Sequence, residues 1–144
     1  MRDIVDIFAT LGEELQGFGR DATTTAIIDA AIEHNPWFTP TDIERAVEAI
    51  RIEMLDRTKL DFWLSNYTPV AHPERVAIIM AGNIPLVGFF DLLCVLCSGH
   101  KAYIKPSSKD TILMRYIVDT LRSIEPNIAI YDYSAEEQYD RVIA

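Results

Sequence analysis

Residues 76–113 read VAIIMAGNIPLVGFFDLLCVLCSGHKAYIKPSSKDTIL, and this stretch decides the fold of the chain. The apolar, β-branched run at 75–80 predicts a short strand that is buried on both faces. Residues 85–97 are apolar almost throughout and predict a buried helix, which Gly99 ends. A second short strand is predicted at 102–105. Two strands joined through a helix by short connections predict parallel pairing with a right-handed crossover.

The alternation of strands and helices continues towards the C-terminus. It predicts an amphipathic helix at 109–124, a third strand at 127–131, and a fourth strand at 139–144 after a short helix around Ala135. We therefore expect an α/β fold in which N-terminal helices precede part of a doubly wound parallel sheet.

Residues 1–67 carry apolar side chains at helical spacing and predict three helices and a final aromatic turn. The second helix should stop before Asn35, because a proline follows that residue. Two caps are available for the third helix: Thr39, or a capping box of Thr41 and Glu44. The aromatic side chains expected to anchor the core are Trp37, Phe38, Phe62 and Trp63.

The change of pattern sets the expected domain organisation. Residues 1–67 form a helical region, residues 68–74 a connector with two prolines, and residues 75–144 a partial nucleotide-binding βαβ domain.

The composition excludes several classes of partner. The chain has 13 basic and 22 acidic residues, and a net charge of −9 disfavours binding to nucleic acid or to an anionic membrane. A small anionic ligand stays compatible with this charge, because backbone N–H groups can bind one locally. The N-terminus does not resemble a signal peptide and no apolar stretch is long enough to span a membrane. We expect a cytoplasmic protein.

The two cysteines, Cys94 and Cys97, lie inside the apolar helix and are expected to be small core residues. A Cys-x-x-Cys pair can also serve redox chemistry or metal binding. Zinc would need two further ligands, and His34, His72 and His100 show no ligand spacing. No metal site is expected.

Two loops follow the first two predicted strands, at 81–85 and 105–108, and in doubly wound sheets ligands bind at this edge. The amide of Asn83 could cap the buried helix, or it could donate a hydrogen bond to an oxyanion. Lys105 and the serines after it could be an exposed lysine and a helix cap, or they could bind the ribose or phosphate of a nucleotide.

Two motifs in these loops resemble a known family. Asn-Ile-Pro-Leu at 83–86 and Gly-His-Lys-Ala-Tyr-Ile-Lys-Pro at 99–106 match, in type, order and separation, the LuxC-like acyl-CoA reductases. More distantly they resemble the aldehyde dehydrogenases. The helical region from Phe8 onward also resembles the N-terminal region of these reductases. The resemblance implies an aldehyde dehydrogenase-like, Rossmann-type cofactor domain.

The resemblance also implies roles for individual residues. In this family an acyl-CoA thioester is reduced to an aldehyde through a thioester on a catalytic cysteine, and Asn83 would help to stabilise the oxyanion of the thiohemiacetal. Lys105 would bind the adenosine ribose of the nicotinamide cofactor. The residues implied in cofactor binding are Gly82, Lys105, Pro106, Ser107 and Ser108.

The chain departs from the family at three points. Gly82 stands where aldehyde dehydrogenases usually have tryptophan, and Ser108 stands where NAD-preferring enzymes often have glutamate. Without that carboxylate a 2′-phosphate is not repelled, which favours NADPH as the cofactor, with NADH as the alternative. The family's nucleophilic cysteine and its pyrophosphate loop lie further downstream. We therefore expect the N-terminal part of an acyl-CoA reductase that is inactive alone.

An alternative from another functional class is a non-catalytic binding or interaction module, or a truncated gene product, with the same half-fold. In either case the half-sheet should expose an unpaired edge, so we expect a homo-oligomer that covers it.

Overall fold

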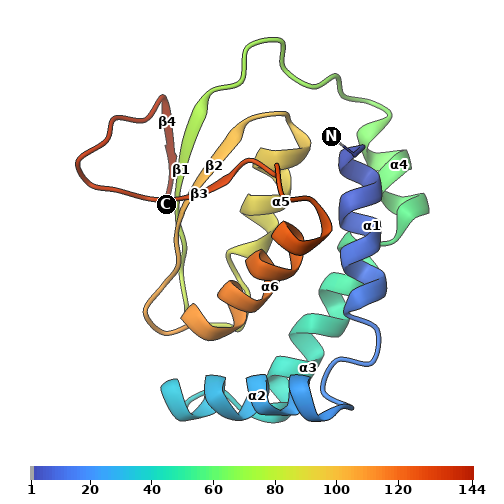
Figure 1. The fold of residues 1–144 in the computed structure, drawn as a ribbon, viewed down its shortest axis with the longest axis vertical. Helices are drawn as coiled ribbons and strands as arrows, with labels where there is room; N and C mark the ends of the chain where they lie inside the picture. Colours follow the sequence, from blue (N-terminus) through green and yellow to red (C-terminus); the bar gives the residue numbers. More distant parts are fainter. Residues whose placement is uncertain (1) are drawn as a thin grey trace.

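The computed structural model describes residues 2–144, in which a parallel four-stranded sheet packs against a layer of helices (Figure 1). The strands are β1 (Arg75–Ile79), β2 (Lys101–Lys105), β3 (Ile130–Asp132) and β4 (Arg141–Ile143), in the spatial order β3-β2-β1-β4. Each neighbouring pair is parallel. This arrangement confirms the expected α/β fold with part of a Rossmann-like sheet.

The strand β1 lies at the centre of the sheet because its side chains are apolar on both faces. Val76, Ala77 and Ile78 are all buried. Ala77 pairs with Tyr103 of β2 on one side and with Val142 of β4 on the other. The predicted strand buried on both faces is therefore confirmed.

Helices α5 (Phe89–Cys97) and α6 (Thr111–Ile124) make the crossovers and cover one face of the sheet (Figure 1). The amphipathic helix predicted at 109–124 is confirmed as α6, since Leu113, Ile117 and Leu121 on one side of it are buried. The helix α5 begins four residues later than the sequence pattern predicts.

The connection from β3 to β4 runs on the other side of the sheet from these helices (Figure 1). The short helix expected around Ala135 is wrong, because residues 133–140 contain only a turn at 135–136 and otherwise irregular structure. Two hydrogen bonds hold this segment: Ser134 N donates to the hydroxyl of Tyr139 at 2.8 Å, and that hydroxyl donates to Ser134 O at 3.1 Å.

The N-terminal helices are α1 (Ile4–Glu14), α2 (Ala22–His34), α3 (Pro40–Ala49) and α4 (Arg57–Leu64), with a π-helical turn η1 (Ile50–Met54) after α3. The side chain of Thr39 accepts from Asp42 N at 3.1 Å, so Thr39 is the cap of α3. The alternative capping box of Thr41 and Glu44 is not used.

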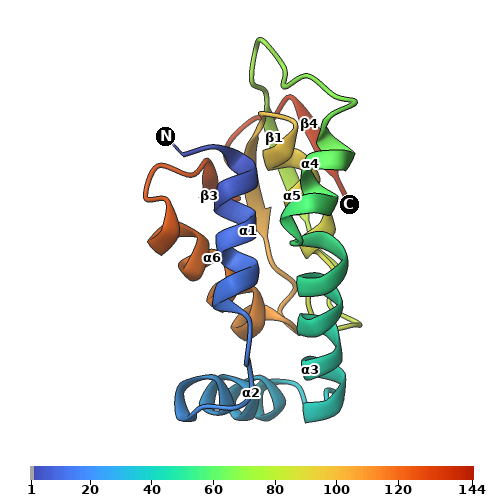
Figure 2. The same ribbon diagram turned by 90° about the vertical axis from the view of Figure 1, so that its right-hand side faces the viewer.

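The helical region and the sheet layer share one hydrophobic core. Helix α1 lies between α6 and the column formed by α3, η1 and α4 (Figure 2). The rings of Phe8 in α1 and Phe89 in α5 meet edge to face, with centroids 6.2 Å apart, and both side chains are fully buried. No helix within residues 2–144 is both long and apolar enough to cross a membrane.

The aromatic side chains of the helical region do not all anchor the core. Phe38 is buried, but Trp37 is 91% exposed and Phe62 is 77% exposed, so the expectation is wrong for these two residues. Trp37 lies in the turn between α2 and α3, where its backbone N–H donates to Asn35 Oδ1. The half-buried ring of Trp63 stacks on Phe90 of α5 at 6.3 Å.

Candidate functional site

The two candidate loops lie side by side at the edge of the sheet where β1 and β2 end. The last residues of these strands, Ile79 and Lys105, are partners in the parallel register. One residue further along, Met80 N donates to Lys105 O at 3.0 Å. The loop after β1 and the loop after β2 therefore leave the sheet together.

Gly82 lies close against the loop that follows β2. A Cβ atom at this position would lie 2.5 Å from Ser107 Cβ and 3.2 Å from Lys109 Cβ. A side chain therefore cannot fit at residue 82 without moving the second loop. The departure from the tryptophan that aldehyde dehydrogenases usually have here thus has a steric reason in this chain.

Asn83 is exposed, and within residues 2–144 its side chain has no hydrogen-bond partner. It does not cap the buried helix, because α5 begins only at Phe89 with Gly88 as its N-cap residue. The capping interpretation of Asn83 is therefore wrong. Its amide is free to meet a ligand at the sheet edge.

The residues between Asn83 and α5 form a turn rather than helix. Leu86 has a φ of +59°, which places a branched side chain in the left-handed region. This conformation costs on the order of 1 kcal/mol for a residue other than glycine. On the side of Gly88 the turn packs tightly against Met80, whose Cγ would lie 2.6 Å from an added Cβ. Tertiary contacts thus replace the first helical turn that the pattern predicts.

Asp110 connects this turn to the second loop, and sequence reasoning missed it. Its side chain is buried, with 4% of the residue exposed, and Oδ2 accepts a hydrogen bond from Leu86 N at 2.6 Å. Among the described residues Oδ1 has no partner. Burial raises the pKa of Asp110 to about 6, and the hydrogen bond from Leu86 opposes part of that rise. The sequence pattern placed Asp110 inside the helix predicted at 109–124, so it gave no signal of this contact.

Lys105 ends β2 with its side chain exposed. Its Nζ lies 5.7 Å from the centre of the Tyr133 ring, within the range of a cation–π contact. Tyr133 follows β3, and its N–H donates to Ile104 O at 2.9 Å. Sequence reasoning did not select Tyr133, although its place two residues after the strand predicted at 127–131 could have indicated it.

The remaining predicted residues form the tight turn that follows β2. Pro106 and Ser107 are partly buried, and Ser107 Oγ accepts from Lys109 N at 3.2 Å. Asp110, and neither serine, is the N-cap residue of α6, so the expected serine cap is wrong. Ser108 is exposed, and its carbonyl oxygen lies 2.5 Å from His34 Nε2 at the end of α2. Gly82, Asn83, Lys105 and the serines thus share one edge of the sheet.

Cys97 is buried in the core, whereas Cys94 is only partly buried, so the core prediction is confirmed for Cys97 alone. Burial raises the pKa of Cys97 to about 12 and also raises the pKa of Cys94. Neither thiol is therefore appreciably ionised at neutral pH, which a nucleophile or a metal ligand requires. Within residues 2–144 no cluster of His, Cys, Asp or Glu side chains has the arrangement of a metal site.

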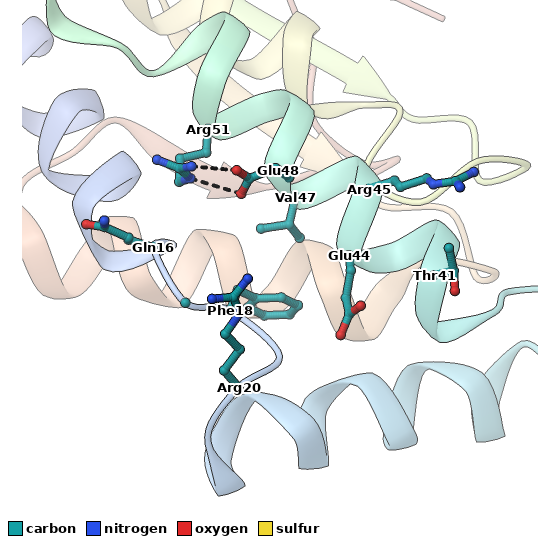
Figure 3. Close-up of a pocket in the computed structure, with 10 residues that line it drawn as sticks. Gln16, Phe18, Arg20, Thr41, Glu44, Arg45, Val47, Glu48 and Arg51 are labelled. Atoms are coloured by element: carbon teal, nitrogen blue, oxygen red, sulfur yellow. Dashed lines mark hydrogen bonds and ion pairs between the residues drawn. The ribbon is translucent and has the colours of Figure 1, made fainter.

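A separate cavity of about 440 Å³ lies between the α1–α2 turn and α3, and none of the predicted site residues lines it (Figure 3). Arg51 pairs with Glu48 through two hydrogen bonds, of 3.0 and 2.5 Å. Arg45 extends away from Arg51 and Arg20 (Figure 3). The arginines do not converge on one point, so this cavity is a weaker candidate than the sheet edge.

Comparison of the chain with protein-family models, with curated protein sequences and with solved structures gives no match. The geometry of the sheet edge and the resemblance of the two motifs are therefore what indicates a function for this chain.

The contact at Gly82 generates a stability prediction. Gly82→Ala should lower the free energy of unfolding by about 1–3 kcal/mol, because the new methyl group collides with Ser107. Ser107→Gly in the same chain should restore part of the loss, with a coupling energy of about 1 kcal/mol or more in denaturant unfolding. Strictly additive effects of the two substitutions would contradict the close approach of the loops.

The buried carboxylate generates a pH prediction. The raised pKa of Asp110 means that the folded chain binds this proton more tightly than the unfolded chain does. Its contribution to stability is complete below about pH 4 and is lost as the pH rises through about 6. Relative to Asp110→Asn, the wild-type chain should therefore lose on the order of 1–3 kcal/mol between pH 4 and 7. Asp119→Asn, which removes an exposed carboxylate from the same helix, is the control, and a flat difference for Asp110→Asn would refute the prediction.

Proposed function

We propose that the chain is the N-terminal, cofactor-binding part of an acyl-CoA reductase of the aldehyde dehydrogenase type. The complete enzyme would reduce an acyl-CoA thioester to an aldehyde with NADPH or NADH. The single observation that carries the proposal is the meeting of the two motif loops at one sheet edge, with Asn83 and Lys105 both exposed there. Such an edge is where doubly wound sheets bind nucleotides.

The exposed cations of the second loop support binding of the cofactor. Lys105 would donate a hydrogen bond to the adenosine ribose, and Ser107 and Ser108 would lie beside it. No carboxylate stands at residue 108, and Lys109 is exposed next to it. This local charge favours a 2′-phosphate and therefore NADPH, in spite of the net charge of −9.

Asn83 would act at the reacting carbon. Its free side-chain amide is suited to donate a hydrogen bond to an oxyanion that forms when a thiolate attacks the thioester. Cys94 and Cys97 are poor sources of that thiolate, because burial raises the pKa of both. The nucleophile would come from a further domain, so this chain contributes binding and charge stabilisation rather than the covalent step.

The unpaired side of β4, an outermost strand of the sheet, supports self-association. Val142 at its centre is 63% exposed, and an uncovered apolar strand edge invites pairing with another chain. We propose a homo-oligomer that covers β4, which light scattering would detect.

The cofactor proposal is tested by calorimetric titration of the chain with NADPH and NADH. We expect saturable binding that is tighter for NADPH, and Lys105→Ala should weaken it by about 10- to 100-fold, the scale for a hydrogen bond with a charged donor. Lys101→Ala is the matched control, because Lys101 is also exposed and lies on the same face of β2. Equal losses for both variants would contradict a specific role for Lys105. Absence of binding to either nucleotide would favour the non-catalytic module.

The role of Asn83 is tested in a longer protein that includes the domain with the catalytic cysteine. Asn83→Ala should lower the turnover number by about 10²-fold or more, the usual scale for an oxyanion donor. The Michaelis constant should change much less, because the interaction forms mainly in the transition state. An unchanged turnover number would exclude this role.

A further inference from the structure

The caps of the helices single out Asp110. Four helices begin in the ordinary way, with a side-chain oxygen that accepts from an amide of the same helix. These cap residues are Asp3, Asp21, Thr39 and Asp56. Asp110 occupies the same position at the start of α6 but makes no such bond. Its carboxylate instead accepts from Leu86 N, 24 residues earlier in the chain.

This arrangement is less stable than an ordinary cap would be. The carboxylate is buried at 4% exposure, and within residues 2–144 its Oδ1 finds no donor, a situation that costs free energy. Leu86 is held in the left-handed region, which adds strain. The buried carboxylate, the unpartnered Oδ1 and the positive φ of Leu86 each cost free energy. None of them stabilises α6, since its first amides gain no side-chain acceptor.

What the bond does achieve is to fix the turn that carries Asn83. In the described part of the chain, the bond from Leu86 to Asp110 is the only hydrogen bond between residues 83–88 and a distant segment. The other bonds of the turn are local, such as Val87 N to Ile84 O at 3.2 Å. Without Asp110 the turn would lose this bond, and only packing contacts such as that between Gly88 and Met80 would hold it in place.

We propose that Asp110 is a positioning residue, which holds Leu86 N–H so that Asn83 is presented at the sheet edge beside the loop of Lys105. The inference rests on the proposed function for its purpose, because positioning matters only if Asn83 meets a ligand. Whether Asp110 holds the turn in place does not depend on what the chain binds.

The turn can be measured directly in this chain by amide hydrogen exchange and NMR. Asp110→Ala should lower the exchange protection of the Leu86 amide by about 10- to 100-fold beyond any change at Ala77 and Ile78 in β1. A residue with positive φ gives a strong NMR cross-relaxation peak between its own HN and Hα protons. This peak of Leu86 should weaken as well. Asp110→Asn keeps an oxygen acceptor and should preserve the contact, with a loss of protection below about 10-fold. Asp119→Asn on the same helix should change neither.

Two results would overturn the proposal. One is an equal loss of protection at Leu86 and in β1, which would mean that Asp110 supports only global stability. The other is an unchanged Leu86 amide in Asp110→Ala, or an Asp110→Asn variant that behaves like alanine. The cofactor titration with Lys105→Ala is a separate measurement, so failure of the proposed function and failure of this inference are distinguishable.

Discussion

The parallel register between β1 and β2 is the constraint on which the candidate site depends. Because Ile79 lies opposite Lys105, both strands end at the same level and their loops leave the sheet side by side. Only glycine fits at residue 82, where the first loop then touches Ser107. The hydrogen bond from Leu86 N to Asp110 is a second connection, which joins the turn after β1 to the start of α6. A shift of one residue in the register would separate every one of these contacts.

The elements of the sheet could be predicted from the sequence because their signals are local. The apolar run of β1 is buried as its pattern indicates, the short strand predicted at 102–105 forms β2, and the apolar side of the amphipathic helix α6 is buried. The start of α5 could not be predicted. Residues 85–88 have a helix-compatible composition, but packing of Met80 against Gly88 and the bond to Asp110 hold them in a turn. Neither contact follows from a local sequence pattern, because each forms only when the chain has folded.

The candidate site was predictable in its loops but not in its connections. The ends of the strands indicated Asn83 and Lys105, since ligand-binding residues follow strands in this class of fold. Asp110 lies inside the helix predicted at 109–124, and only the folded chain reveals that its carboxylate accepts a hydrogen bond from Leu86 N. The exposure of Trp37 was likewise unpredictable. Its large apolar side chain favours burial, and the sequence does not show that the turn in which it lies points it into solvent.

The two tryptophans have an optical consequence, because their surroundings differ. Trp37 is almost wholly in water, whereas the ring of Trp63 stacks on Phe90 beside the core. Intrinsic fluorescence should therefore contain a red-shifted, readily quenched component and a shielded one. Trp37 follows Asn35, whose amide donates to Lys109 O in the second loop. The solvent-exposed indole thus sits two residues from a contact of the candidate site, and the chain carries its own spectroscopic probe of that loop.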